Sequence, residues 1–247
     1  MNEKQLELKI SNSGEFFDFL KKFSSIDSSL LMEFNSTTIT AKSHTPERSV
    51  VKSSSIALDE IFSEFTIDEP FKVGIFNIDK LKTAFKYFEG SDFTFGINLS
   101  KMQDEWVGTN IFLKNSSLDI SFSCASLSLF TQITNDIMDK ITDTSGFKSK
   151  FLLQREQLAR ITSLFGIDSD YSKITFEITK GKIYVKGKNF KYEVLDDADP
   201  DNNQSLSVFK HHYSFLDNET TEVYMMDDKL VLISTETDTR LIVGESE

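Results

Sequence analysis

The stretch EFFDFLKKFSSID, residues 15–27, has a counterpart in EQLARITSLFGID, residues 156–168. Both stretches start with Glu, end with Ile-Asp before a Ser, and are apolar at equivalent positions, Phe17 and Leu158, Leu20 and Ile161, Phe23 and Leu164. In the first copy Phe16, Phe19, Leu20 and Phe23 follow the i, i+3, i+4, i+7 spacing of an amphipathic helix. Self-similarity at one offset indicates an internal repeat, so the chain is predicted to contain two copies of one module.

The elements around these stretches follow the same order in both halves. Residues 32–34 and 39–42 correspond to 176–178 and 183–186, and all four are expected to be strands. Period-two alternation, which is typical of strands with one packed face, predicts further strands at 6–10, 71–75, 93–97, 118–122, 174–178 and 230–233. Helical spacing predicts helices over 13–24, 79–88, 154–165 and, more weakly patterned, 209–216, with Asp79 as the cap of the second.

Composition excludes several functional classes. The chain has 247 residues, with 27 Lys and Arg against 39 Asp and Glu, a formal charge of −12. Such a protein does not coat nucleic acid or anionic membrane with its whole surface. One cysteine, Cys124, excludes an internal disulfide and a multi-thiolate zinc site. The start resembles no signal peptide, and no apolar run reaches the roughly 18 residues of a membrane helix, so a soluble cytoplasmic protein is expected.

The basic residues are not spread evenly. The four expected helices carry eight basic and four acidic residues, which leaves 19 of the 27 basic and 35 of the 39 acidic residues elsewhere. Lysines on a helix are often only a solvated face, but a shared positive sign on all four helices of an acidic chain favours an anion-binding surface. The eight residues are Lys21, Lys22, Lys80, Lys82, Lys86, Arg155, Arg160 and Lys210.

Two such modules in an acidic chain of this length resemble the trimeric sliding DNA clamps, the family of the proliferating cell nuclear antigen (PCNA) and of the T4-like bacteriophage clamp. Residues 158–164, 174–178 and 183–187 look most like the bacteriophage type. The resemblance implies an α+β fold with two tandem clamp modules, antiparallel sheets outside and helices lining the inside of a ring. It implies an N-terminal module at 1–133, an interdomain connector at 134–149 and a C-terminal module at 150–247, whose second helix is truncated.

The resemblance also implies a function. It is that of a DNA polymerase processivity factor, a non-catalytic homotrimeric ring that encircles duplex DNA without sequence preference and tethers the replicase. Its partners would be double-stranded DNA, a DNA polymerase and a clamp loader, with no cofactor, metal or membrane. The eight basic residues would face DNA.

The resemblance assigns two further surfaces. Subunits would join through the edge strands 117–124 and 189–195, because an unpaired edge strand invites another strand. The apolar residues of these strands are Leu118, Ile120, Phe122, Phe190, Tyr192 and Val194. Partner peptides would enter a pocket beside the connector, and the 43–48 loop would form part of its wall. The residues of this pocket would be Ile137, Met138, Ile141, Leu241 and Val243.

A second interpretation is a structural β-rich virion protein or an acidic decoy that mimics DNA. A decoy would place acidic residues where this chain has Lys and Arg on its helices, so the sign of the helix charge separates the two.

No enzymatic motif stands out. Gly181 and Gly187-Lys188 are separated by one residue too many for a phosphate-binding loop and are expected in hairpin turns. Asp197, Asp199 and Asp201 imitate the start of a calcium loop that lacks its Gly and final Glu. Cys124 is expected to be a small core residue. The adjacent His211 and His212 project in different directions and are a poor pair for one metal ion.

Overall fold

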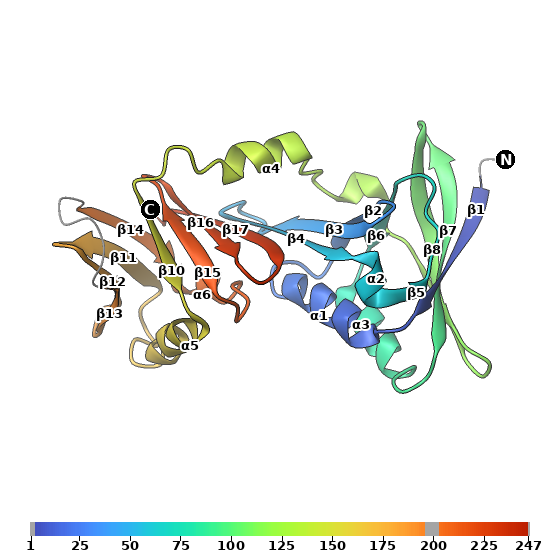
Figure 1. Ribbon diagram of the computed structural model, residues 1–247, viewed down its shortest axis with the longest axis horizontal. Coiled ribbons are helices and arrows are strands. Elements are labelled where there is room, and N and C mark those ends of the chain that lie inside the picture. The colour runs from blue at the N-terminus through green and yellow to red at the C-terminus, as the bar shows by residue number, and fades with distance from the viewer. Residues whose placement is uncertain (1–2, 196–202, 247) are drawn as a thin grey trace. The chain divides into compact units, whose positions relative to one another are not determined.

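The computed structural model describes residues 3–195 and 203–246, which form two compact units (Figure 1). Unit 1 consists of Met1–Ser43 and Ser53–Ile133, and unit 2 of His44–Lys52 and Thr134–Glu247. The short segment His44–Lys52 therefore belongs to the second unit although it lies within the N-terminal half of the sequence. In the part of the chain that the structure describes, no helix is long and apolar enough to cross a membrane.

Unit 1 is a sheet covered by helices. Its strands are β1 (Glu3–Ile10), β2 (Leu30–Phe34), β3 (Thr38–His44), β4 (Val50–Ala57, shared with unit 2), β5 (Phe62–Glu64), β6 (Phe71–Ile75), β7 (Phe93–Met102), β8 (Glu105–Lys114) and β9 (Asp119–Ser123). The order β3-β2-β6-β8-β7-β1-β5, with β9 added on β8, is antiparallel except for a short parallel pairing of β6 with β8. The helices are α1 (Ser13–Ser24), α2 (Leu58–Ile61) and α3 (Ile78–Lys86), and α1 packs against α3.

Phenylalanines fasten the helices of unit 1 to its sheet. Phe16 of α1 is fully buried, and its ring meets those of Phe85 on α3 and Phe95 on β7 edge to face, with centroids 5.4 Å away in both cases. Edge-to-face aromatic pairs add about 0.5–1.5 kcal/mol beyond the area they bury. Much of the unusual phenylalanine content therefore fixes the position of α1 and α3 on the sheet.

Unit 2 contains two antiparallel sheets. One has the order β10 (Ser149–Leu153), β15 (Thr221–Met225), β16 (Lys229–Ser234) and β17 (Asp238–Gly244). The other has the order β13 (Lys191–Leu195), β12 (Lys182–Lys186), β11 (Lys173–Thr179) and β14 (Gln204–Phe209). The helices are α4 (Asn135–Thr142), α5 (Arg155–Leu164) and the one-turn α6 (Lys210–Tyr213). The α+β architecture expected from the sequence is thus confirmed.

The hairpin between β11 and β12 explains one of the glycines. Lys180 and Gly181 form the two-residue turn and both have positive φ, 52° and 76°. Such turns match the twist of the strands and favour Gly, which has no side chain to clash there.

The helix predictions were right in place and incomplete in number. Expected helices at 13–24, 79–88, 154–165 and 209–216 correspond to α1, α3, α5 and α6, the last reduced to four residues. Asp79 is not the cap of α3, because the side chain of Asn77 accepts the hydrogen bond from Lys80 N at 2.9 Å. The segment 134–149, expected as the interdomain connector, contains α4, which is capped by Thr134 and packs on β17.

The repeated Ile-Asp-Ser motif has a different role in each unit. The carboxylate of Asp27 is exposed and accepts hydrogen bonds from Ser29 N and Oγ at 2.9 and 3.0 Å. The carboxylate of Asp168 is buried and accepts from Asn189 N at 3.0 Å and from Asn189 Nδ2 at 2.5 Å, so it holds the turn that leads into β13. Gly187 is needed beside it, because a Cβ there would lie 2.0 Å from Asp168 Oδ2.

We therefore expect Asp168→Ala to destabilise the chain by roughly 2–3 kcal/mol, since it leaves partly buried donors of Asn189 unpaired. Its repeat counterpart, Asp27→Ala, removes only an exposed local turn bond and should cost less than about 1 kcal/mol. Urea unfolding followed by circular dichroism measures both. Equal losses for the two variants would contradict the assignment.

Candidate nucleic-acid interface

Five of the eight basic residues proposed to face DNA are exposed on three helices. Each helix buries an apolar stripe, such as Leu81 and Phe85 on α3 or Leu158 and Ile161 on α5, so its opposite side faces solvent. The five exposed residues are Lys21 on α1, Lys80 and Lys86 on α3, and Arg155 and Arg160 on α5. Lys22, Lys82 and Lys210 are only half-exposed.

The side chain of Lys82 on α3 contacts residues of α3 and of the neighbouring helix α1. Its Nζ lies 2.9 Å from Asp79 Oδ1 and 5.5 Å from the centre of the Phe17 ring on α1. The ammonium group is therefore partly neutralised by an acidic neighbour. Lys86, one turn further along α3, is exposed and is the stronger candidate for a phosphate contact.

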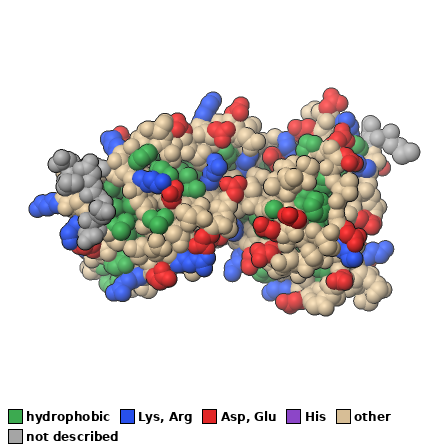
Figure 2. Space-filling model, in the orientation of Figure 1, with side chains coloured by type: hydrophobic (Ala, Val, Ile, Leu, Met, Phe, Trp, Pro, Cys, Tyr) green, Lys and Arg blue, Asp and Glu red, His purple; other side chains and the backbone are tan. Residues whose placement is uncertain are grey.

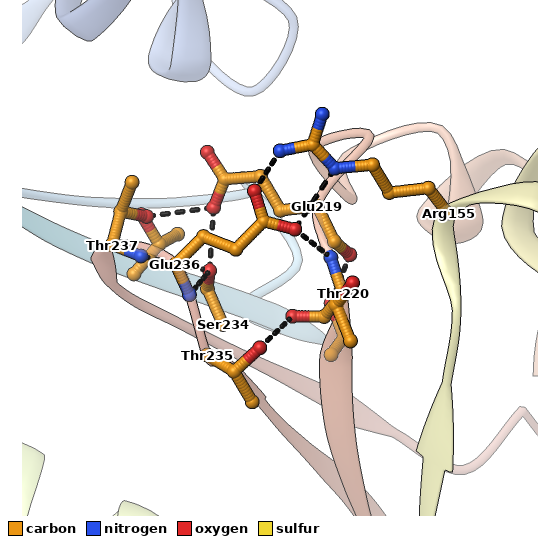
Figure 3. Close-up of polar contacts among 9 residues, drawn as sticks. Arg155, Glu219, Thr220, Ser234, Thr235, Glu236 and Thr237 are labelled. Atoms are coloured by element: carbon orange, nitrogen blue, oxygen red, sulfur yellow. Dashed lines mark hydrogen bonds and ion pairs between the residues drawn. The ribbon is translucent and has the colours of Figure 1, made fainter.

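The guanidinium of Arg155 is paired with the carboxylate of Glu236 (Figure 3). Its Nε donates to Glu236 Oε1 at 2.9 Å, and its Nη2 contacts the other carboxylate oxygen of Glu236. Glu236 also accepts from Thr220 N at 2.7 Å, which orients the carboxylate toward the guanidinium. Arg155 thus forms an ion pair that links α5 to the loop before β17, and the carboxylate of Glu236 compensates much of its positive charge.

Lys210 has a structural role. Its Nζ donates to the carbonyl oxygen of Asp168 at 2.9 Å and to that of Phe165 at 3.5 Å. These carbonyls follow the C-terminal end of α5, where unpaired carbonyls favour a cation. Two backbone carbonyls thus engage the ammonium group of Lys210.

The two helices that the sequence did not predict do not share the positive charge. α2 carries Asp59 and Glu60, and α4 carries Asp136 and Asp139 against Lys140. The positive sign expected for the helices therefore holds for α1, α3, α5 and α6 together and not for every helix. Figure 2 shows acidic and basic side chains mixed over the visible face.

Both strands proposed for subunit contacts are sheet edges. β9 pairs only with β8, and β13 ends its four-stranded sheet, so each has an unpaired side among the described strands. The apolar side chains Leu118, Ile120 and Phe122 are half-buried against the core of unit 1. Phe190, just before β13, and Tyr192 on β13 are half-buried. Val194 on β13 is buried in its own unit and cannot supply apolar surface to a partner.

A groove of about 320 Å³ runs beside the edge strand β9. Phe122 and Ser123 of β9 line it, together with Lys80 of α3 and Phe76, which follows β6. The side chain of Phe76 is 68% exposed, so it presents an apolar ring at the groove. The sequence pattern did not reveal Phe76, because it lies between two elements.

Three of the five residues proposed for the partner-peptide pocket are buried. Leu241 and Val243 are buried side chains of β17, and Met138 is a buried side chain of α4, so none of the three lines an open pocket. Ile141 is half-buried. Ile137 is 45% exposed and remains as the apolar group available on α4.

The other sequence candidates are resolved as follows. Burial raises the pKa of the Cys124 thiol to about 12, and the side chain packs against the core of unit 1. Asp197, Asp199 and Asp201 lie outside the described residues. The expectation that His211 and His212 of α6 project too far apart for one metal ion is wrong, because their ligand atoms and one of Glu47, in the loop between β3 and β4, all lie within 4.8 Å of one another.

Comparison with known proteins places the fold. No family model matches the chain, and no curated protein matches it in sequence. Among solved structures, the Entamoeba histolytica PCNA is 13% identical with a TM-score of 0.68, covering 98% of this chain and 99% of that one. The Thermococcus kodakaraensis PCNA is 12% identical with a TM-score of 0.67, covering 98% of this chain and 100% of that one.

A chain of the PCNA2–PCNA3 complex from Sulfolobus tokodaii is 12% identical with a TM-score of 0.66, covering 97% of this chain and 98% of that one. In all three cases the match runs over nearly the entire length of both chains. The resemblance noted in the sequence is therefore confirmed at the level of the fold, and this chain has the fold of the PCNA sliding clamps.

Proposed function

We propose that this chain is the subunit of a sliding clamp, a ring that encircles duplex DNA and keeps a replicative polymerase on its template. The observation that carries the proposal is the combination of a full-length clamp fold with exposed basic residues on α1, α3 and α5 of a chain with net charge −12. The proposed role is mechanical, and no residue performs chemistry.

Phosphate contacts suit this role because they hold DNA without reading its sequence. Lys21, Lys86 and Arg160 would supply such contacts, and the acidic remainder of the chain would repel DNA from other surfaces. A polymerase bound to the ring would stay at a high effective concentration near the primer end, so that it rebinds before it diffuses away.

The proposed assembly is a homotrimer joined by the edges of β9 and β13. Identical chains that meet head to tail form a closed ring when the rotation between them closes. Two modules in each chain would give six in a ring of three, with a mass of about 85 kDa, three times 28.2 kDa. We also propose that the ring is a clamp of the bacteriophage type. Its protein partners would be a clamp loader, which opens the ring, and a DNA polymerase.

The test is the mass in solution, followed by retention on DNA of two topologies. After loading with the loader and ATP, the protein should stay on nicked circular plasmid in high salt and slide off once the plasmid is cut. A purely electrostatic binder would leave both forms alike. A chain that stays monomeric well above micromolar concentration, or equal retention on circular and cut DNA, would overturn the proposal.

We further propose that α4 is part of the surface that binds the polymerase. Ile137 exposes an apolar side chain next to Asp136 and Lys140, and Asp139 and Asp143 add negative charge nearby. Exposed apolar groups within an acidic surface favour a peptide with an apolar anchor and flanking Lys or Arg.

Accordingly, Ile137→Asp should weaken binding of the polymerase's C-terminal peptide at least about tenfold, because the anchor would meet a carboxylate. Ile167→Asp is the matched control, since Ile167 is 55% exposed after the end of α5. Fluorescence anisotropy with a labelled peptide measures both. If Ile137→Asp binds as tightly as the control, the peptide site lies elsewhere.

A further inference from the structure

Unit 2 brings together three side chains that are far apart in the sequence. Glu47, in the loop between β3 and β4, and His211 and His212, in α6, each offer one ligand atom, and these atoms all lie within 4.8 Å of one another. Glu47 and His211 are exposed, whereas His212 is buried. All three belong to unit 2.

The Glu47 loop is held in place by hydrogen bonds. Thr45 N donates to Val50 O at 3.0 Å, Arg48 N to Thr45 O at 2.8 Å, and Gly244 N of β17 to Ser49 O at 2.8 Å. Ser49 Oγ donates to Glu47 Oε1 at 2.8 Å and lies 3.1 Å from His212 Nε2. One hydroxyl therefore fixes both the carboxylate and the buried imidazole.

The spacing fits a small ion with short bonds. His212 Nε2 lies 3.5 Å from Glu47 Oε1. With metal–ligand bonds of about 2.0–2.1 Å, two ligands of a tetrahedral zinc ion lie roughly 3.3–3.4 Å apart. The wider separations within the 4.8 Å limit can close by rotation of the exposed side chain of His211.

The ion would bind His212 through Nε2, the nitrogen that lies near Glu47 Oε1 and the Ser49 hydroxyl. With Nε2 as the ligand, the ring proton is on Nδ1, which is buried and has no hydrogen-bond partner among the described residues.

We propose that Glu47, His211 and His212 form a binding site for a divalent transition-metal ion of the zinc type. Two imidazoles and one carboxylate are a zinc ligand set, and a water molecule would complete the tetrahedron. Mg²⁺ and Ca²⁺ prefer all-oxygen sites, so these ions are excluded by the donor set. The ion would clip the Glu47 loop to α6 within unit 2 and stabilise the folded chain by mass action.

The experiment uses the full-length chain, stripped with a chelator and dialysed. Zn²⁺ is titrated by calorimetry, and Co²⁺ is titrated while the visible d–d absorption of a tetrahedral ion is recorded. We expect one ion per chain, tetrahedral Co²⁺ bands and a melting temperature that rises with Zn²⁺ concentration. Glu47→Gln and His211→Gln should each weaken binding at least about tenfold.

His44→Gln is the matched control, because His44 is the remaining histidine of the chain and is not part of the cluster. Melting in the absence of metal shows that the variants at the exposed residues Glu47 and His211 fold. The proposal is overturned if the chain binds no Zn²⁺ at about 100 μM, or if the two ligand variants bind Zn²⁺ as His44→Gln does. The assay needs neither DNA nor polymerase, so its result is independent of the proposed clamp function.

Discussion

Replacement of Phe76 by aspartate is expected to convert the proposed trimer of about 85 kDa into chains of 28.2 kDa. Phe76 lines the groove beside β9 and is 68% exposed, so its substitution leaves the core of unit 1 intact. Burial of a phenylalanine side chain contributes about 2–3 kcal/mol, and a carboxylate at the same place adds a desolvation cost. Each subunit contact should therefore weaken at least about a hundredfold, and three contacts fail together in a closed ring.

Light scattering measures the mass, and Tyr87→Asp provides the control. Tyr87 is 69% exposed, also in unit 1, but it caps the C-terminal end of α3 and does not line the groove. The control should keep the mass of wild type. A Phe76→Asp protein that stays at the trimer mass would show that subunits do not meet at β9, whatever its activity on DNA.

The parts of the fold that could be predicted are those with a long local pattern. α1, α3 and α5 have two or more turns with apolar residues at helical spacing, and each alternating strand has one packed face. α2 has four residues, too few for any period to show. In α4 the apolar residues are Ile137, Met138 and Ile141, too narrow a stripe to indicate a helix, although Thr134 before Asp136 is a start signal.

The site shows the same limit. Exposure of Lys21, Lys86 and Arg160 follows from the period of their helices, so it was predictable. The partners of Arg155 and Lys210 were not, because Glu236 and the Asp168 carbonyl are far away in sequence and reach these cations only through tertiary structure. Glu47 beside the histidine pair is a third case, in which the ligand comes from a loop near the other end of the chain.

The combined variant Lys21→Glu, Lys86→Glu, Arg160→Glu should lose at least about tenfold in the mean length of DNA that the polymerase copies per binding event. These three residues are exposed on α1, α3 and α5. Lys82 and Arg155 are left unchanged because Asp79 and Glu236 already compensate them, and Lys80 because it lines the groove beside β9. Each reversal replaces an attraction for phosphate by a repulsion, and a ring of three chains would carry nine reversals.

A control variant distinguishes the effect of a lower net charge of the chain from the effect of removing positive charge from α1, α3 and α5. The variant Lys9→Glu, Lys101→Glu, Lys180→Glu changes the charge by the same amount at exposed residues of β1, of β7 and of the turn between β11 and β12, outside the basic helices and outside α4. It should keep both the trimer mass and the copied length, whereas the helix variant keeps the mass and loses the length, with a weaker salt dependence because fewer counterions are released from DNA. If both variants lose processivity equally, the acidic surface as a whole governs DNA and the helices have no special part. If neither loses it, DNA does not lie along α1, α3 and α5.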